Sequence, residues 1–442
     1  MTKRVDEKTL QFVRDHAGDD VRQLALMGSK HPEVDMPWAL DQIRGRQVAA
    51  AKLPLLARIE GIHYPVHLSM EQCSSQTAAH YKLRVARRLI AEGDRASMTD
   101  LTGGFGIDFL ALSTTFRSAT YVERNEELCE LMRHNLSVLG RTATVMCTEA
   151  EQTLDAIAPQ TLIYIDPARR DAAGGRTYAI ADCTPDVLGL APTLCAKGRW
   201  VMVKLSPMLD WHEAVRALGC VSEVHIVSVG GECKELLLVL ASDGTPEVQV
   251  FCVDILSRPD SEGLYPRSEF VYSIATNAQE EIVENNSKLE NSTSAQPTNS
   301  TFNIQHSTLP PATNSTFNIQ YSTFLFEPNA SVMKAGCFDE IARAYGVSAI
   351  SRNSHLFLSD HEIDGFPGRS FAIDAVTTMN KRQLRQTLSG MKQANIAVRN
   401  FPLSVAELRK RLKLSDGGDT YIFATTTSEG DHILMLTHKT KK

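Results

Sequence analysis

The sequence contains 442 residues, of which 43% are hydrophobic and 22% are charged, and its formal net charge is −6. This composition is ordinary for a soluble globular protein with enough chain for two to four domains, and it excludes a chain that is polycationic throughout. The nine cysteines include no C-x-x-C pair, which argues against a disulfide framework and a zinc site. Because neither a signal sequence nor an apolar run of about 20 residues occurs, we predict a cytoplasmic protein with no metal and no membrane contact.

The first 75 residues read as a helical region. Apolar residues recur every three or four positions through residues 1–60, which is the spacing of helices with one buried face. A further amphipathic helix is expected over residues 76–92, with Ser74 or Ser75 as its N-cap.

Residues 76–243 alternate between expected strands and helices. Strands are predicted at residues 96–101, 119–123, 143–147, 161–166 and 199–205, and a closing hairpin is predicted at residues 223–242. This alternation predicts one α/β domain with a Rossmann-like, doubly wound sheet of seven strands.

The remaining chain is expected to form small α+β domains. Residues 278–322 are rich in Asn, Ser, Thr and Gln and contain "TNSTFNIQ" twice, so we interpret them as a low-complexity insertion in a module covering 244–375. Residues 376–442 form the last predicted domain, and residues 381–442 contain 12 Lys and Arg against 5 Asp and Glu. This basic tail is compatible with nucleic-acid contact and equally with a solvated helix face.

The stretch "DLTGGFGID" follows the first strand of the α/β domain. A dinucleotide-binding turn has a third small residue, but Phe109 stands at that position here. The acid at the strand end, Asp100, followed by Gly104 and Gly106, resembles motif I of class I S-adenosylmethionine (SAM) methyltransferases. The ammonium of SAM would favour Asp100, and its carboxylate suits the backbone N–H groups at a helix start. We place Thr102 and Asp108, which flank the glycines, in the same site.

Further residues follow later strands in the order that this resemblance implies. Glu123, at the end of the second strand, would accept the ribose hydroxyls, with Arg124 beside it, and Glu149 and Ala150 would face adenine. Taken alone, Glu123 is equally well explained as an exposed charge at a strand end. A Rossmann-type oxidoreductase would share Glu123 but would not explain Asp100, the missing third glycine or the motif at the fourth strand.

Two residues ahead of the first strand complete the predicted cofactor site. In class I methyltransferases the entry helix closes over the methionine end of SAM, and the short polar side chains of Gln72 and Ser75 suit that place. A plain N-cap is the equally good explanation of Ser75.

The fourth strand ends in "IDPARRD", which is similar to motif IV of these enzymes. Asp166 would orient an acceptor amine, with the Pro167 carbonyl beside it. Ala168 replaces the second proline and Arg169 replaces the aromatic residue, so Arg169 would bind a phosphate or stack on a base instead. The D-P-x-R form also resembles RNA uracil-C5 methyltransferases, but the S-C-N-P segment that carries their nucleophile is absent.

The whole chain, apart from the insertion, resembles a bacterial group of class I methyltransferases with a ferredoxin-like module and a C-terminal THUMP-like domain. The segments that carry this resemblance are "EQCSSQTAAHYK", "DLTGGFGID", "IDPARRD", "FEPNASVMKAGCF" and the stretch from residue 395 to 425. Because THUMP domains elsewhere bind RNA, the resemblance implies methylation of a base in tRNA or rRNA. Two alternatives stay open: a protein or small-molecule methyltransferase, and a non-catalytic RNA-binding protein that retains SAM. The oligomeric state is also open.

Overall fold

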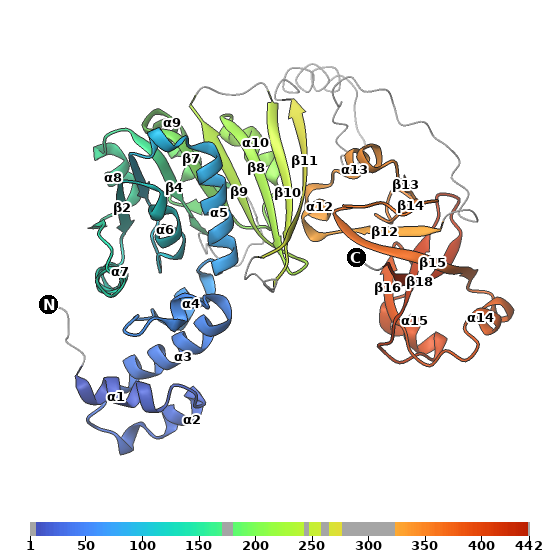
Figure 1. Cartoon of the computed structure of the whole chain (residues 1–442), viewed down its shortest axis with the longest axis horizontal. Helices are drawn as coiled ribbons and strands as arrows, with labels where there is room; N and C mark the ends of the chain where they lie inside the picture. The colour runs from blue at the N-terminus through green and yellow to red at the C-terminus, as the bar shows by residue number, and fades with distance from the viewer. Residues whose placement is uncertain (1–5, 170–179, 243–246, 258–264, 276–322, 441–442) are drawn as a thin grey trace, which may run out of the picture. The chain divides into compact units, whose positions relative to one another are not determined.

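The computed structural model describes residues 6–169, 180–242, 247–257, 265–275 and 323–440 (Figure 1). The chain forms two compact units, which we call unit 1 and unit 2. Unit 1 is Met1–Val224 with Glu235–Val248, and unit 2 is His225–Lys234 with Gln249–Lys442. The predicted low-complexity insertion at residues 278–322 lies outside the described residues.

Unit 1 begins with five helices, of which α4 lies outside the stretches 1–60 and 76–92 whose apolar spacing predicted helices. They are α1 (Glu7–Asp15), α2 (Val21–Leu26), α3 (Met36–Lys52), α4 (His67–Gln72) and α5 (Gln76–Leu89). Aspartates cap three of them; Asp6, for example, accepts a hydrogen bond from the Thr9 backbone N–H at 2.8 Å. Of the two serines considered as the cap of α5, Ser75 takes the role, because its hydroxyl accepts from the Ala78 N–H at 3.2 Å.

The main sheet has nine strands. They are β1 (Ser97–Asp100), β2 (Ser118–Glu123), β3 (Thr144–Cys147), β4 (Gln160–Ile165), β7 (Gly198–Leu205), β8 (Val221–Val229), β9 (Glu232–Ala241), β10 (Glu247–Ile255) and β11 (Arg267–Ala275). The order is β11-β10-β8-β9-β7-β4-β1-β2-β3, with β7, β4, β1, β2 and β3 parallel and β9 antiparallel to β7. The seven predicted strands are all present. The sheet continues into β10 and β11, which the sequence had placed in the next module.

Helices of 6 to 13 residues follow these strands. They are α6 (Ile107–Leu112), α7 (Glu126–Val138), α8 (Ala150–Ala156), α9 (Val187–Lys197) and α10 (Trp211–Leu218). Between β4 and α9, β5 (Ala168–Arg169) pairs with β6 (Cys183–Thr184). Single 3-10 turns occur at residues 28–30, 56–58, 92–94, 113–115 and 180–182. The last four residues of β4 are fully buried, as expected for a parallel strand covered on both faces.

Unit 2 contains a second sheet of seven strands. They are β12 (Phe324–Pro328), β13 (Ser348–Ala349), β14 (Phe357–Ser359), β15 (Gly368–Thr378), β16 (Asn395–Arg399), β17 (Thr420–Thr426) and β18 (His432–Lys439), in the order β13-β14-β12-β15-β18-β17-β16. Its helices are α12 (Ala330–Ala335), α13 (Phe338–Tyr345), α14 (Lys381–Thr387) and α15 (Val405–Leu412). β15 crosses residue 375, where the sequence suggested a domain boundary, and pairs with both β12 and β18.

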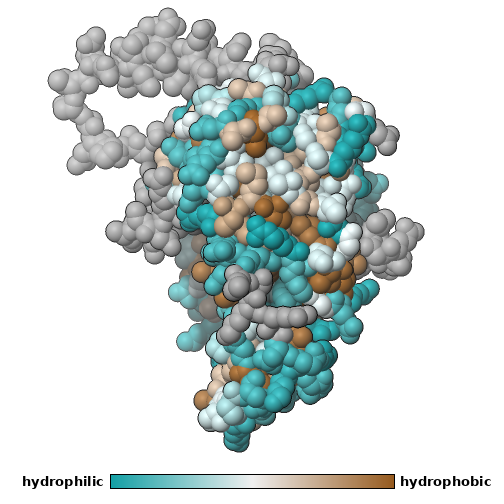
Figure 2. All heavy atoms as spheres, turned by 90° about the vertical axis from the view of Figure 1, so that its left-hand side faces the viewer, coloured by the Kyte–Doolittle hydropathy of each residue, from teal (hydrophilic) through white to brown (hydrophobic). Residues whose placement is uncertain are grey.

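Hydrophilic residues predominate on the face of the molecule drawn in Figure 2. Figure 2 shows one face on which hydrophobic residues form small separate patches. The exposed large hydrophobic residues of unit 1 are Leu26, Leu55, Ile59, Val66, Leu68 and Met208. Among the described residues, no helix combines the length and apolarity that crossing a membrane requires.

Candidate functional site

The carboxyl ends of the parallel strands bring most of the predicted site residues to one edge of the sheet. Asp100 is the last residue of β1 and pairs in register with Tyr121 of β2 and Tyr164 of β4. Glu123 is the last residue of β2, and Asp166 follows β4 directly. In parallel α/β sheets this edge, with its strand-to-helix turns, is where ligands bind.

The glycine turn between β1 and α6 is tightly packed at Gly103 and Gly106 and open at Gly104. A Cβ on Gly103 would lie 2.1 Å from the Tyr121 ring, and one on Gly106, whose φ is +82°, would lie 1.9 Å from Met132 Cε. The Tyr121 hydroxyl donates to the Gly104 carbonyl at 2.5 Å. Gly104 has a φ of +53°, and the atom nearest to a Cβ added there would be the Thr102 carbonyl oxygen, at 3.9 Å. A ligand can therefore approach the backbone over Gly104.

Glu123 is fixed by the backbone around it. Its Oε2 accepts from the Gly104 N–H and its Oε1 from the Asn125 N–H, both at 2.9 Å. Each carboxylate oxygen has a second lone pair, so the group can still accept hydrogen bonds from a ligand. This geometry holds a carboxylate next to the glycine turn in one orientation, as binding of a pair of hydroxyl groups requires.

Asp100 lies deeper, with only 1% of its surface exposed. Its Oδ1 accepts from the Thr102 N–H at 3.0 Å. Burial raises the pKa of Asp100 well above its usual range, and the nearby carboxylates of Asp108, Asp166 and Glu123 raise it further. A cationic partner would relieve this repulsion. SAM carries an ammonium and a sulfonium, so the residues present fit that group.

The other predicted cofactor residues occupy the ends of neighbouring elements. Gln72 is exposed at the end of α4, and Ser75 is committed to capping α5. Arg124 is exposed in the turn after β2. Glu149 is exposed at the N-cap position of α8, and the buried Ala150 is the first residue of that helix, so both follow β3 at the same sheet edge.

The motif at the end of β4 is tied to the glycine turn and to β7. The Asp166 N–H donates to Thr102 Oγ1 at 2.6 Å, and Asp166 Oδ2 accepts from Lys204 Nζ at 2.5 Å. Pro167 is buried, and Arg169 belongs to the two-residue strand β5. Burial by itself would lower the pKa of Lys204, but the carboxylates of Asp166, Glu235 and Asp108 raise it above its usual value.

A group of buried charges lies beside this motif. Asp108 was predicted from the sequence as a cofactor contact, whereas Lys82 and Glu235 were not singled out. Lys82 of α5 has no exposed surface, and its Nζ donates to both oxygens of Glu235 at 2.8 and 2.7 Å. The same ammonium lies 3.1 Å from Ser74 Oγ and 3.2 Å from Asp108 Oδ1. Asp108 Oδ2 accepts from the hydroxyls of Ser74 and Tyr164, both at 2.7 Å. We call Lys82, Asp108 and Glu235 the buried charge cluster.

This arrangement gives Asp108 protein partners for its carboxylate. Burial alone would raise the pKa of Asp108, but Lys82, Lys204 and the hydrogen bonds from Ser74 and Tyr164 lower it below its usual value. A signal was present in the sequence: Lys82 stands at a buried position of the α5 face that also carries Ala78, Val85 and Ala86. A charge at a core position of an amphipathic helix indicates a buried partner.

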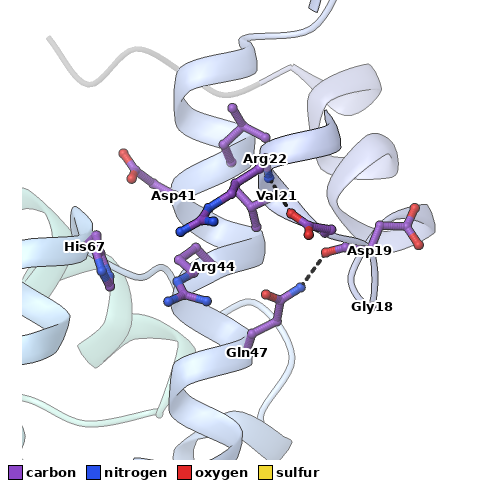
Figure 3. Close-up of a pocket in the computed structure, with 10 residues that line it drawn as sticks. Gly18, Asp19, Val21, Arg22, Asp41, Arg44, Gln47 and His67 are labelled. Atoms are coloured by element: carbon purple, nitrogen blue, oxygen red, sulfur yellow. Dashed lines mark hydrogen bonds between the residues drawn. The ribbon is translucent and has the colours of Figure 1, made fainter. Parts of the chain in front are cut away.

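A cavity also lies in the helical region of unit 1, away from this sheet edge. It has a volume of about 700 Å³ and is lined by Gly18, Asp19, Asp20, Val21, Arg22, Leu40, Asp41, Arg44, Gln47 and His67. Figure 3 shows Arg22, Arg44 and Gln47 reaching from α2 and α3 towards it, with His67 on its other side. No predicted site residue lines this cavity, so the candidate site rests on the sheet edge. Within the described ranges, no cluster of three or more His, Cys, Asp or Glu residues is arranged to hold a metal.

Comparisons with known proteins agree with this architecture. Residues 368–439 match the THUMP domain-like family model, and residues 324–367 match a ferredoxin-like domain. The chain is 28% identical to a crystal structure of a "putative methyltransferase" from Porphyromonas gingivalis W83, with a TM-score of 0.77 and 99% of each chain covered. An rRNA methylase from Streptococcus thermophilus is 13% identical over 37% of this chain and 94% of its own, with a TM-score of 0.29. A comparison with curated proteins returned no match.

These findings confirm the fold class predicted from the sequence. The chain has the Rossmann-like sheet of class I methyltransferases, an N-terminal helical region and the ferredoxin-like and THUMP-like segments at its C-terminal end. The similarity extends over the whole length of the chain rather than over the sheet alone.

Proposed function

We propose that this chain is a cytoplasmic, SAM-dependent methyltransferase that acts on structured RNA. The observation that carries the proposal is the group of carboxylates from Asp100, Glu123 and Asp166 around the open glycine turn. It is supported by the similarity over 99% of the chain to a protein described as a "putative methyltransferase". As parts of this proposal, residues 1–75 form a helical region, 76–243 the catalytic domain, 244–375 the ferredoxin-like module and 376–442 the THUMP-like domain.

The cofactor would be held by the glycine turn and the strand ends around it. Asp100 would bind the ammonium, the backbone at Thr102, Gly104 and Gly106 would approach the methionine end, and Glu123 would accept the ribose hydroxyls. The remaining predicted contacts are Gln72, Ser75, Asp108, Arg124, Glu149 and Ala150. When bound, SAM supplies an electrophilic methyl group.

The protein's own contribution to catalysis would be orientation and a polar environment. Asp166 is held at two points, through its N–H by Thr102 and through its carboxylate by Lys204, so its position relative to the glycine turn is fixed. A fixed carboxylate can align an acceptor group and receive its proton. Pro167 would shape this turn, and Arg169 would contact the acceptor's phosphate or base.

RNA is the proposed acceptor because the THUMP-like segment follows the catalytic domain. α15 places Arg409, Lys410 and Arg411 in its last turn, where cations can contact phosphates. Part of this charge is already used inside the domain, since Arg409 pairs with Asp416 at 2.6 Å.

Calorimetric titration with SAM tests the cofactor. Micromolar binding to the full chain is expected, and Asp100→Ala and Glu123→Ala should each weaken it by about 1–3 kcal/mol through loss of a charge-assisted hydrogen bond. Glu151→Gln, an exposed carboxylate on α8, is the matched control and should change nothing. A folded wild-type chain that does not bind SAM would disprove the proposal.

Transfer of labelled methyl groups from SAM to cellular RNA tests the substrate. Label in protein or small molecules but not in RNA would favour the alternative methyltransferase. SAM binding with salt-sensitive RNA retention and no transfer would favour a non-catalytic RNA-binding protein.

A further inference from the structure

The carboxylate that would orient the acceptor is already bound to a lysine. Lys204 Nζ lies 2.5 Å from Asp166 Oδ2, and the two side chains are 15% and 31% exposed, so the pair is accessible from the sheet edge. Lys204 is also under the electrostatic influence of Glu235 and Asp108, which in turn are held by Lys82. Two lysines and three carboxylates therefore act together beside the glycine turn.

This arrangement is poorly matched to an exocyclic amine, the acceptor suggested by the Asp-Pro turn. The amine of a nucleobase presents two N–H donors, and its nitrogen gains positive charge as it is methylated. It therefore needs acceptors and a negative surrounding, whereas the Lys204 ammonium offers only donors and a positive charge. In the sequence, Arg169 also stands at the position where a stacking ring would support a flipped base.

A hydroxyl group matches the same pair. It donates one hydrogen bond and accepts others, so it can donate to Asp166 and accept from Lys204 at the same time. An oxygen nucleophile becomes more reactive as it partly loses its proton, and an ammonium stabilises the negative charge that then develops on the oxygen. The buried charge cluster keeps a cation at this place by surrounding Lys204 with carboxylates.

We propose that the acceptor is an alcohol, the ribose 2′-hydroxyl of RNA, and that Asp166 and Lys204 bind it together. This inference rests on the proposed function. The hydroxyl oxygen forms a bond to the methyl carbon, the methyl–sulfur bond breaks with its electron pair left on sulfur, and the sulfonium charge is neutralised. The hydroxyl proton passes to Asp166 Oδ1 and then to water. Lys82 and Glu235 are positioning residues for this pair.

The position of the methyl group in the product tests the inference directly. The full chain is incubated with methyl-labelled SAM and total RNA from cells that lack the protein, and the RNA is then hydrolysed with alkali. A 2′-O-methyl group removes the hydroxyl that attacks the neighbouring phosphodiester, so the label is expected in alkali-stable dinucleotides and, after enzymatic digestion, in the ribose fragment by mass spectrometry. Label in mononucleotides with the methyl on the base would overturn the inference. Absence of label from RNA, with SAM still bound, would instead refute the RNA substrate and the ribose assignment with it.

Variants of Lys204 separate its role from support of the fold. Lys204→Met should lower methyl transfer at least 100-fold while SAM affinity by calorimetry changes less than about threefold. Lys204→Arg keeps the cation and should recover part of the rate. Lys234→Met, at an exposed lysine of β9, is the control and should keep the full rate. Wild-type transfer by a folded Lys204→Met variant would overturn the assignment.

Discussion

The buried lysine of α5 allows a quantitative test of unit 1. Lys82 has no exposed surface, while Glu235 and Asp108, which it contacts, are 2% and 8% exposed. In Lys82→Met both carboxylates stay buried but lose their shared cation. Removing one partner of a buried ion pair costs about 3–5 kcal/mol, a large share of the roughly 5–15 kcal/mol by which a protein is stable.

Urea unfolding followed by tryptophan fluorescence measures this loss. All three tryptophans, Trp38, Trp200 and Trp211, belong to unit 1, so their emission reports that unit. With a slope of about 2 kcal/mol per molar urea, the midpoint should fall by roughly 1.5–2.5 M. Lys8→Met, an exposed lysine on α1, is the matched control and should shift the free energy of unfolding by less than about 0.5 kcal/mol.

The double variant Lys82→Met/Glu235→Leu makes the test stricter. Replacing both partners with apolar groups removes one uncompensated carboxylate, so the double variant should be more stable than Lys82→Met alone. Asp108 would remain buried with only its hydroxyl partners, so recovery should be partial. A loss below about 1 kcal/mol in Lys82→Met, or a double variant less stable than that single one, would refute the reasoning.

Three further predictions concern the glycine turn and the helical region. The folded pKa of Asp100 lies above its ordinary value of 3.8, so its contribution to stability is present below pH 3.8 and is lost as pH rises through the folded pKa. Asp100→Asn should therefore stabilise the ligand-free chain at pH 7 while it weakens SAM binding, and a variant that is less stable in urea would contradict this. Gly104→Ala should lower the free energy of unfolding by only about 1–2 kcal/mol, because the φ of Gly104 is +53° while the space around an added Cβ is open. SAM titration of the same variant should show a large loss of affinity, and unchanged affinity would argue against a ligand over the turn. Burial first, and then the neighbouring His134, hold the pKa of His63 at about 4 instead of 6.5. The contribution of His63 to stability is therefore present above pH 6.5 and is lost as pH falls towards 4. His63→Gln should flatten that part of the acid unfolding profile, and an unchanged profile would contradict the assignment.

Local patterns predicted most of unit 1. The alternation of apolar strands with amphipathic helices determined the type of each element, and the capping residues and glycines marked their ends. Because parallel strands share one carboxyl edge, the positions of Asp100, Glu123 and Asp166 at strand ends were sufficient to expect them together. Contacts between distant segments could not be derived in this way. Lys82 and Glu235 are 153 positions apart, and no local rule pairs them.

Strand pairing accounts for the remaining differences. The segment of β10 was recognised as a strand, but its neighbours in the sheet depend on long-range pairing, which the alternation of side chains along one strand does not specify. For the same reason the sequence did not show that β15, which crosses residue 375, pairs with β12 and then with β18.

The shared strand β15 also limits how the C-terminal part of this chain can be divided. The two family matches meet between residues 367 and 368, immediately before β15 begins. A chain cut at that point would leave β12 with an open row of backbone donors and acceptors along five residues and would uncover the hydrophobic Leu325 and Phe371 that pack in one cluster. Exposed edges of this kind recruit other strands and promote aggregation. The ferredoxin-like and THUMP-like segments are therefore expected to fold, and to be degraded, as a single structural unit.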